Sequence, residues 1–456
     1  MGASVVWLRR DLRVHDHPAL SAAAGRGEPL LLVYVLEDDD PWAPGGAMRD
    51  WLHRSLASLE TELEKHGHRL VYLRGAACEQ LPALVAAVGA DALYCLRRYE
   101  PHGRAVDEAL ATTLAPDCTM HVLPGNLLFE PEAVSTGGGT PFRVFTPYYR
   151  ACLQCGAPPA PLPPPRRWPA ALDWRGGPSL AALELQPRIA WADGIRARWP
   201  AGEHAAHLAL DTFLDERVGE YAARRDRPAI TGTSALSPYL AVGALSARSA
   251  WQAAQQGGRA TADAWLRQLV WREFAYQLLF HFPHTPTAPF RPEWSEFQWC
   301  EAPAALARWQ RGETGIPLVD AGMRELWVTG YMHNRVRMVV ASLLCKHLGV
   351  HWLAGARWFW DTLVDADLAN NTLGWQWTAG CGADAAPYFR IFNPVSQGVK
   401  FDADGAYVRH WLPARAQLLD AAVHDPAVPA TGYPAPIVDL AAGREAALAR
   451  YAALKR

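Results

Sequence analysis

Lysine is scarce in this sequence, and no overall basic balance replaces it. Only four lysines occur among 456 residues, and the formal net charge is −2. The chain therefore lacks the global positive charge typical of many DNA-binding proteins, so any nucleic-acid site has to be a local patch. Arginine carries almost all of the positive charge, which we attribute to codon usage; phosphate recognition by guanidinium groups is the alternative.

Long apolar runs are also missing. No run approaches the ~20 residues that a membrane-spanning helix needs. The first residues, MGASVVWLRRDLR, read as a strand and contain no basic segment followed by an apolar core, as a signal peptide would. We therefore expect a cytoplasmic protein that does not contact a membrane.

The common signatures of metal and hydrolytic centres are absent. The eight cysteines are scattered, and only Cys152 and Cys155 form a C-x-x-C pair. No cluster of His, Asp or Glu has metal-ligand spacing, and neither G-x-S-x-G nor H-E-x-x-H occurs. The GGGT segment at 137–140 lacks the Gly-Lys of a phosphate-binding loop. We expect reduced thiols and no bound metal.

Tryptophan is abundant: the chain contains 20. Most of these side chains are expected in the core, but an indole can also stack on a nucleic-acid base or carry an electron.

Short apolar runs alternate with helical patterns over residues 1–125. Strands separated by helices indicate right-handed crossovers and a parallel sheet. We predict a doubly wound α/β domain, in which ligands bind at the carboxyl ends of the strands. Its strands are expected at 4–8, 30–36, 70–73, 92–96 and 121–123, with a helix at 48–66.

The pattern changes after residue 125. Residues 126–200 contain the run PPAPLPPPRRWP and few periodic segments, which predicts an interdomain linker that is partly extended. Residues 201–456 are helical in pattern and predict an all-α domain.

Two helices of this domain carry polar and aromatic groups opposite a core face, which suits a large planar ligand with polar edges. On a helix predicted over 334–348 these groups are Asn334, Arg337 and Met338. On a helix predicted over 263–281 they are Trp265, Gln268, Trp271 and Arg272.

Five segments of the chain are distinctive: VVWLRRDLRVHDHPAL at the start, RDRPAITGTSALSPYLAVGALS at 225–246, LVWREFAYQLLF at 269–280, GYMHNRVRM at 330–338 and DADLANNTLGWQWTAGCGADAAPYFRIFNPVSQG at 365–398. They resemble the photolyase and cryptochrome family, closest to bacterial class I cyclobutane pyrimidine dimer photolyases, and run in the family's order along nearly the whole chain. The resemblance implies an α/β antenna domain and an all-α domain that holds one U-shaped FAD, which agrees with the pattern above.

The resemblance implies a set of FAD-binding residues. Hydroxyls and backbone N–H groups at a turn that enters a helix suit the diphosphate and ribityl oxygens. A charge pair beside the isoalloxazine would tune its protonation, and an amide facing N5 is typical of the repair enzymes. The implied residues are Tyr221, Thr233, Ser234, Ala235, Leu236, Ser237, Trp265, Gln268, Arg272 and Asn334, with Arg337 and Asp365 as the charge pair, Asp367 at the pyrimidine edge and Asn371 at N5.

The family's electron-transfer residues have counterparts here in Trp375, Trp352 and Trp299, from the flavin to the surface. The resemblance also implies aromatic walls for a flipped-out dimer and arginines along the DNA path, which position the duplex without reading its sequence. These lesion and DNA residues are Trp271, Trp377, Gln268, Asn334, Met338, Arg225, Arg272, Arg335, Arg390 and Gln397.

Gln268 departs from the pattern of cyclobutane-dimer enzymes, which usually have a glutamate at this position. Enzymes that repair the (6-4) photoproduct commonly have glutamine here, but they also need histidines where this chain has Asn334 and Met338. We therefore expect cyclobutane dimer repair with a reduced yield, because an amide replaces a carboxyl donor imperfectly.

The antenna segment YEPHGRAVD at 99–107 lacks the Asn-Glu pair of folate-binding members, since His102 and Gly103 stand in its place. A deazaflavin or flavin antenna is expected over folate, unless the site is empty. The expected partner is UV-damaged DNA and the expected state is a monomer. A cryptochrome-type light receptor and a (6-4) photolyase are the alternatives; Trp271, Trp377 and Asn371 argue against the receptor.

Overall fold

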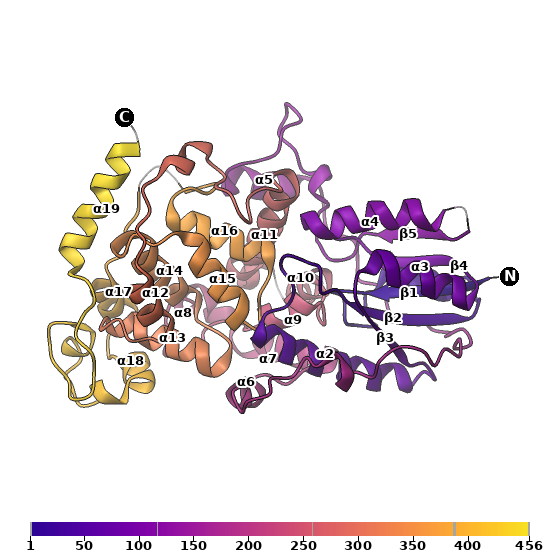
Figure 1. The fold of residues 1–456 in the computed structure, drawn as a ribbon, viewed down its shortest axis with the longest axis horizontal. Coiled ribbons are helices and arrows are strands. Elements are labelled where there is room, and N and C mark those ends of the chain that lie inside the picture. The colour runs from indigo at the N-terminus through magenta and orange to yellow at the C-terminus, as the bar shows by residue number, and fades with distance from the viewer. Residues whose placement is uncertain (1, 116, 258, 386–388, 455–456) are drawn as a thin grey trace.

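The structure is a computed structural model that describes residues 2–115, 117–257, 259–385 and 389–454. Figure 1 shows an α/β region at one end of the molecule and a larger helical region at the other. The boundaries 125 and 200 remain predictions.

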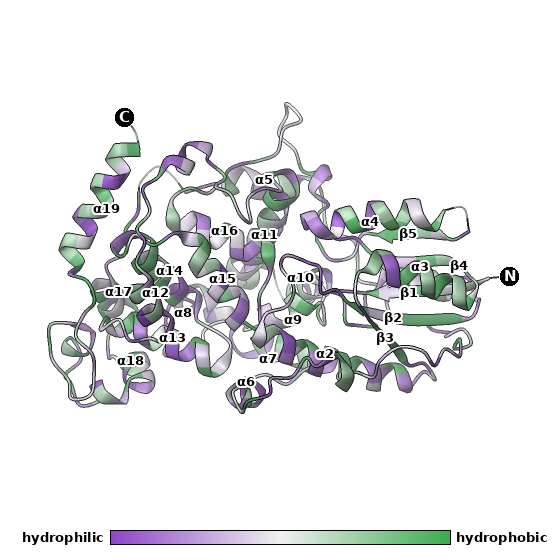
Figure 2. Ribbon diagram, viewed as in Figure 1, coloured by the Kyte–Doolittle hydropathy of each residue, from purple (hydrophilic) through white to green (hydrophobic). Residues whose placement is uncertain are grey.

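A five-stranded parallel sheet forms the centre of the α/β region. Its order is β3-β2-β1-β4-β5, so the predicted doubly wound topology is confirmed. The first two strands are buried along their whole length, which explains why they are continuous apolar runs instead of alternating patterns. Figure 2 shows β2 almost entirely in the hydrophobic colour. The strands are β1 (Ala3–Leu8), β2 (Leu30–Leu36), β3 (Leu70–Arg74), β4 (Ala90–Leu96) and β5 (Thr119–Leu123).

Helices cover both faces of this sheet. Val5 and Trp7 point into a core shared with α3 and α4, whereas Val6 and Leu8 point to the face that α1 and α2 cover. This second core is continuous with the helical region, so the two regions share apolar packing. The helices are α1 (Pro18–Gly25), α2 (Gly46–Glu64), α3 (Ala77–Val88) and α4 (Pro101–Leu114).

The predicted linker is ordered against both regions. Its residues around Ala171 run beside β2, where the Leu30 N–H donates to Ala170 and the Leu172 N–H donates to Leu30. It also contains α5 (Phe145–Gln154), which packs on α11, and α6 (Asp193–Arg198). The linker is therefore part of the fold and not a free tether.

The helical region contains the elements that position the site. The helix predicted over 334–348 is α-helical to Ser342 and continues as a π-helical turn over Leu343–His347, a change of hydrogen-bond pattern that the sequence did not predict. The helices are α7 (Glu203–Glu216), α8 (Tyr221–Arg224), α9 (Ser237–Val242), α10 (Ala247–Gln256), α11 (Arg259–His281), α12 (Pro303–Gln310), α13 (Pro317–Thr329), α14 (Asn334–Ser342), α15 (Trp352–Thr362), α16 (Leu368–Ala379), α17 (Pro394–Phe401), α18 (Ala406–Trp411) and α19 (Leu440–Leu454).

Candidate functional site

Many of the predicted site residues lie on α11, α14 and α16 or in the loops beside these helices. The helices α11, α14 and α15 all pack against α16. Figure 1 shows these four helices together in the helical region, so the fold brings together segments that are far apart in sequence.

An ion pair at this centre joins α14 to the turn before α16. Arg337 Nη2 donates to both carboxylate oxygens of Asp365, at 2.9 and 3.1 Å. Ser237, the first residue of α9, donates its hydroxyl to Asp365 Oδ2 at 2.6 Å. Burial alone would lower the pKa of Arg337, but the carboxylate of Asp365 outweighs it and raises that pKa. The structure thus brings together three predicted cofactor residues.

Asp367 begins α16. Its Oδ1 accepts from the Asn370 backbone N–H at 2.9 Å and from the Asn370 amide at 2.6 Å, while Oδ2 accepts from the Tyr276 hydroxyl. Arg10, from the end of β1, lies 3.9 Å away. Both carboxylate oxygens are therefore held within the protein, and Asp367 fixes the start of α16. A contact of Asp367 with the flavin remains a prediction.

Asn371 lies one turn further along α16. Its amide Nδ2 donates to the Ala356 carbonyl of α15 at 3.0 Å. This bond fixes the plane of the amide and leaves the carbonyl oxygen as the group that can accept from a ligand. An acceptor in this position matches the role that the resemblance implies.

The loop before α9 has an unusual backbone. Ala235 has φ +53°, a left-handed conformation that a residue with a side chain rarely adopts. Such strain is concentrated at functional sites, where the surrounding structure holds it. Thr233 and Ser234 are half-buried beside it, whereas Leu236 is buried in the core, so only its backbone is open to a ligand.

Two other predicted cofactor residues are core aromatics. Trp265 is 3 % exposed and packs on Phe213, with ring centroids 5.2 Å apart. Phe213 in turn contacts Tyr221 at 5.8 Å, and Arg225 lies over the Tyr221 ring. This aromatic row anchors α8 to α11, and its contact with a cofactor remains a prediction.

The three predicted electron-transfer tryptophans run from the core toward the surface. Trp375 and Trp352 are buried on the packed helices α16 and α15, and Trp299 is half-buried. The His351 ring lies between the outer two, 5.5 Å from Trp352 and 5.0 Å from Trp299. Trp375 Nε1 is buried and has no hydrogen-bond partner within the described residues.

Several predicted DNA residues gather where the segment after α8 meets α11 and α14. Arg225 Nη2 donates to Gln268 Oε1 at 3.1 Å, and Arg335 pairs with Asp226 at 2.9 Å. Asn334 is exposed, with its amide 4.0 Å from the sulfur of Met338. The segment of Arg225 and Asp226 therefore links Gln268 of α11 to Arg335 of α14.

The two predicted aromatic walls are supported from behind. Trp271 stacks on Phe145 of the linker, with ring centroids 3.7 Å apart and an interplanar angle of 8°. Trp377 donates its indole N–H to the Asp384 carbonyl at 3.1 Å, and the Arg390 guanidinium lies 5.5 Å from the centre of its ring. Gln397 on α17 has a buried Oε1 without a partner among the described residues.

Arg272 is placed apart from the other predicted DNA residues. Its guanidinium donates to the Asn126 carbonyl at 3.0 Å and to Glu273 at 2.9 Å, and its side chain is only 13 % exposed. In this structure Arg272 therefore joins α11 to the linker instead of reaching the surface with Arg225. The sequence pattern placed Arg272 on the same side of the helix as Gln268. Arg272 lies one turn further along α11, where its guanidinium contacts the linker at the junction of the two regions.

The sequence reasoning missed Glu273 and Arg10. Glu273 Oε2 accepts from the backbone N–H groups of Leu128 and Phe129, at 2.6 and 3.3 Å, and so anchors the linker to α11. Arg10, at the carboxyl end of β1, lies 3.9 Å from both Glu100 and Asp367. A charge inside an apolar helix face was the available signal for Glu273.

Comparisons with known proteins agree with this geometry. The DNA photolyase profile matches residues 4–166, and the profile of the FAD binding domain of DNA photolyase matches residues 265–453. A deoxyribodipyrimidine photo-lyase of Agrobacterium fabrum is 44 % identical over 99 % of this chain and 98 % of its own length. The chain belongs to the DNA photolyase family.

Solved structures extend this family match. A bacterial class III photolyase from Agrobacterium tumefaciens has a TM-score of 0.95 and 43 % identity, covering 100 % of this chain and 98 % of that one. A cryptochrome from Synechocystis has a TM-score of 0.90 and 28 % identity, covering 98 % of each chain. The family, the two-part fold and an FAD-binding enzyme of DNA repair, all expected from the sequence, are confirmed. Over the described ranges, no helix is both long and apolar enough to cross a membrane.

The residues at the centre fit FAD. They offer hydroxyls and a strained loop at the start of α9, a fixed guanidinium–carboxylate pair, and an amide acceptor on α16. These are the donor and acceptor types that a diphosphate, a pyrimidine edge and a ring N–H require. FAD binding follows from the family profile over residues 265–453.

Proposed function

We propose that this photolyase repairs cyclobutane pyrimidine dimers in DNA. The observation that carries the proposal is a polar cluster in which Arg225 donates to Gln268, while the neighbouring Asp226 pairs with Arg335 of α14, whose first turns carry Asn334 and Met338. This cluster offers an amide and a soft apolar group to a dimer and contains neither of the two histidines expected for the (6-4) lesion.

The chain's own residues prepare the centre for the cofactor. Bound reduced FAD supplies an electron to the dimer when it absorbs blue light. The Arg337–Asp365 pair offers a fixed charge distribution beside it, and the Asn371 carbonyl oxygen can accept a hydrogen bond from the N5–H of the reduced flavin. Ring splitting itself requires no acid or base from the protein, so these residues act by binding and orientation.

Trp375, Trp352 and Trp299 are proposed to return oxidised flavin to its reduced state. The inner two are buried and the outer one is half-buried, so a hole can move from the flavin to a residue that solvent reaches. The buried indole N–H of Trp375 lacks a partner within the described residues, which disfavours loss of its proton at that step.

The DNA contact is proposed as a local arginine patch, in keeping with the net charge of −2. Arg225, Arg335 and Arg390 border the polar cluster or Trp377, and guanidinium groups at these points suit phosphates on either side of an extruded dimer. Arg272 is not included, because its guanidinium is engaged at the domain junction.

For the antenna we propose a deazaflavin or flavin in place of folate. A Cβ added at Gly103 would lie 2.8 Å from Arg98 Cβ, so this position has no space for the glutamate of folate-binding members. Monomeric state, cytoplasmic location and membership of class I are predictions of the same kind; the similarity to a class III photolyase argues for testing the class directly.

The test uses purified protein reduced in the dark and mixed with oligonucleotides that carry either a cyclobutane thymine dimer or a (6-4) photoproduct. Blue light follows, and chromatography counts the restored thymines. Repair of the cyclobutane substrate alone supports the proposal. Repair of the (6-4) substrate would show that Gln268 decides the lesion. The absence of both repairs, with normal flavin photoreduction, would favour a receptor, which the similarity to a cryptochrome makes the second candidate.

A second arm isolates the tryptophan path. Trp352→Phe should abolish or strongly slow the light-driven reduction of oxidised flavin, because phenylalanine is much harder to oxidise than tryptophan. The same variant, reduced chemically in the dark, should repair dimers at the unchanged rate. Equal loss of both activities would mean that Trp352 acts through the fold and not through electron transfer.

A further inference from the structure

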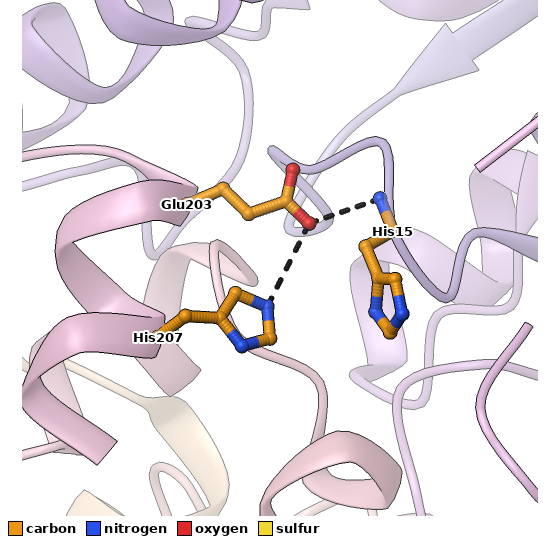
Figure 3. Close-up of side chains that lie close together, drawn as sticks. All are labelled: His15, Glu203 and His207. Atoms are coloured by element: carbon orange, nitrogen blue, oxygen red, sulfur yellow. Dashed lines mark hydrogen bonds and ion pairs between the residues drawn. The ribbon is translucent and has the colours of Figure 1, made fainter. Parts of the chain in front are cut away.

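Three side chains with metal-binding groups meet at the junction of the two regions, away from the proposed flavin and DNA site. His15 lies in the loop that follows β1, Glu203 is the first residue of α7, and His207 lies one turn later on α7. Their nearest nitrogen and oxygen atoms all lie within 4.8 Å of one another. Figure 3 shows the carboxylate of Glu203 pointing between the two imidazoles.

Contacts within the group and to Val14 and Ser249 hold the three side chains together. Glu203 Oε2 accepts from the Val14 N–H at 2.8 Å and Oε1 accepts from the His15 N–H at 2.9 Å, which ties the loop to α7. The spacing of four residues puts His207 on the same helix face, with its Nε2 3.9 Å from Glu203 Oε1. The Ser249 hydroxyl lies 3.4 Å from His15 Nδ1, which leaves Nε2 of that ring for a ligand.

Burial lowers the pKa of both His15 and His207, which favours the neutral imidazole that binds a metal ion. Burial raises the pKa of Glu203 to about 7, and a metal ion would displace that proton. The charged side chains around the group have both signs. Arg13, whose guanidinium donates to three backbone carbonyls, would repel a bound cation. The carboxylates of Asp16, Asp211 and Glu62 would attract it.

We propose that His15, Glu203 and His207 bind one divalent transition-metal ion, with zinc preferred and water as the fourth ligand. Two imidazoles, one carboxylate and water form a known zinc ligand set. Ligand atoms around tetrahedral zinc lie about 3.4 Å apart. Side-chain rotations that move the three ligand atoms by roughly 1 Å would bring them to this separation. His207 is 35 % exposed, which leaves a path for the ion and for the water.

The expected consequence is structural. The ion would connect the loop after β1 to α7 and so reinforce the contact that Glu203 already makes with Val14 and His15. The site was invisible to motif spacing because 188 residues separate His15 from Glu203. It is independent of the proposed repair activity, since none of its residues belongs to the flavin or DNA site.

The test is zinc binding by untagged full-length protein after treatment with a chelator. Calorimetric titration with zinc chloride gives stoichiometry and affinity, and cobalt substitution gives a visible spectrum that reports tetrahedral coordination. The variants are His15→Gln and His207→Gln. The matched control is His204→Gln, because His204 is exposed on the same helix and beside Glu203 but lies outside the group.

The proposal predicts one equivalent of zinc for the unaltered protein and for His204→Gln, with an affinity at least about tenfold weaker in the other two variants. Zinc should raise the melting temperature of the first two proteins and not of the others. Melting curves without zinc show whether each variant is folded. Absence of stoichiometric binding, or equal binding by all four proteins, would overturn the proposal.

Discussion

Gly355 on α15 lies under the ring of Trp375, and replacing it with alanine tests how tightly that tryptophan is packed. A Cβ added at Gly355 would lie 2.1 Å from Trp375 Cη2, 2.4 Å from Cζ3 and 2.7 Å from Leu344 Cδ2. Ordinary contacts between such carbon atoms are about 3.5 Å or more. The indole of Trp375 or the backbone of α15 must therefore move by more than about 1 Å in the Gly355→Ala variant.

Two opposing terms set the size of the effect. Overpacking a well-packed core costs about 1–3 kcal/mol. Alanine in place of glycine inside a helix returns about 1 kcal/mol. We therefore expect Gly355→Ala to lower the stability to unfolding by about 0–2 kcal/mol. Light-driven reduction of the flavin should also slow, because the displaced ring is the tryptophan expected next to the cofactor.

Gly374 on α16 supplies the matched control. It is exposed, and an added Cβ there would meet nothing within 4 Å. Gly374→Ala should therefore gain the helix term alone and become more stable by about 0.5–1 kcal/mol. Urea unfolding followed by circular dichroism measures both variants, and flavin absorbance under blue light measures photoreduction. If Gly355→Ala were as stable as Gly374→Ala, the packing argument for Trp375 would be refuted.

Two further substitutions test electrostatic arguments. Gln268→Glu should raise the repair quantum yield, because a protonated carboxyl donates a stronger hydrogen bond to a dimer anion than an amide does. Arg225 lies 3.1 Å from Gln268 Oε1 and should lower the pKa of the new carboxyl. The gain in yield should therefore be larger at about pH 6, where more of the carboxyl is protonated, than at about pH 8. Equal yields at both pH values, counted by chromatography, would contradict this. Burial lowers the pKa of Lys346 to about 7, its ammonium lying 3.2 Å from the centre of the Phe389 ring. Between pH 7 and 10 the unfolded protein then binds more protons than the folded protein, so the free energy of unfolding rises with pH in that window. Lys346→Met should be more stable than the unaltered protein at pH 7, and this advantage should shrink by about 2 kcal/mol at pH 9. If urea unfolding gave the same difference in stability at both pH values, the lowered pKa of Lys346 would be contradicted.

The strands were predictable because their physical signal is local. A parallel sheet that is covered on both faces requires apolar runs, and all five runs became strands within a few residues of their expected ends. The helix after Asn334 was predicted to continue beyond Ser342, but periodicity cannot separate an α-helical turn from the π-helical turn that follows. The local sequence pattern therefore predicted which strands and helices form better than it predicted the residues at which they end.

The site was predictable only where the family motif supplied it. Arg337 and Asp365 are 28 residues apart, and no periodicity links them, yet the structure joins them directly. Arg272 was predicted on the same helix side as Gln268, and the structure shows its guanidinium donating to the Asn126 carbonyl of the linker; its cofactor and DNA roles stay predictions. The orientation of a long side chain depends on contacts with segments that are distant in sequence.

Contacts between segments that are distant in sequence also connect the α/β region to the site, apart from any role of that region in binding an antenna chromophore. Arg10 extends from the end of β1 to Asp367, the residue that begins α16, and Asp367 is also held by Tyr276 of α11. Burial alone would raise the pKa of Glu100, which lies between the two regions, but the guanidiniums of Arg98 and Arg10 outweigh it and lower that pKa to about 2. This junction therefore stays charged over the whole physiological range. Because Asn371 lies one turn beyond Asp367, any shift of the carboxyl end of β1 that moves Arg10 acts first on the start of the helix that carries this amide, which is proposed to face the flavin.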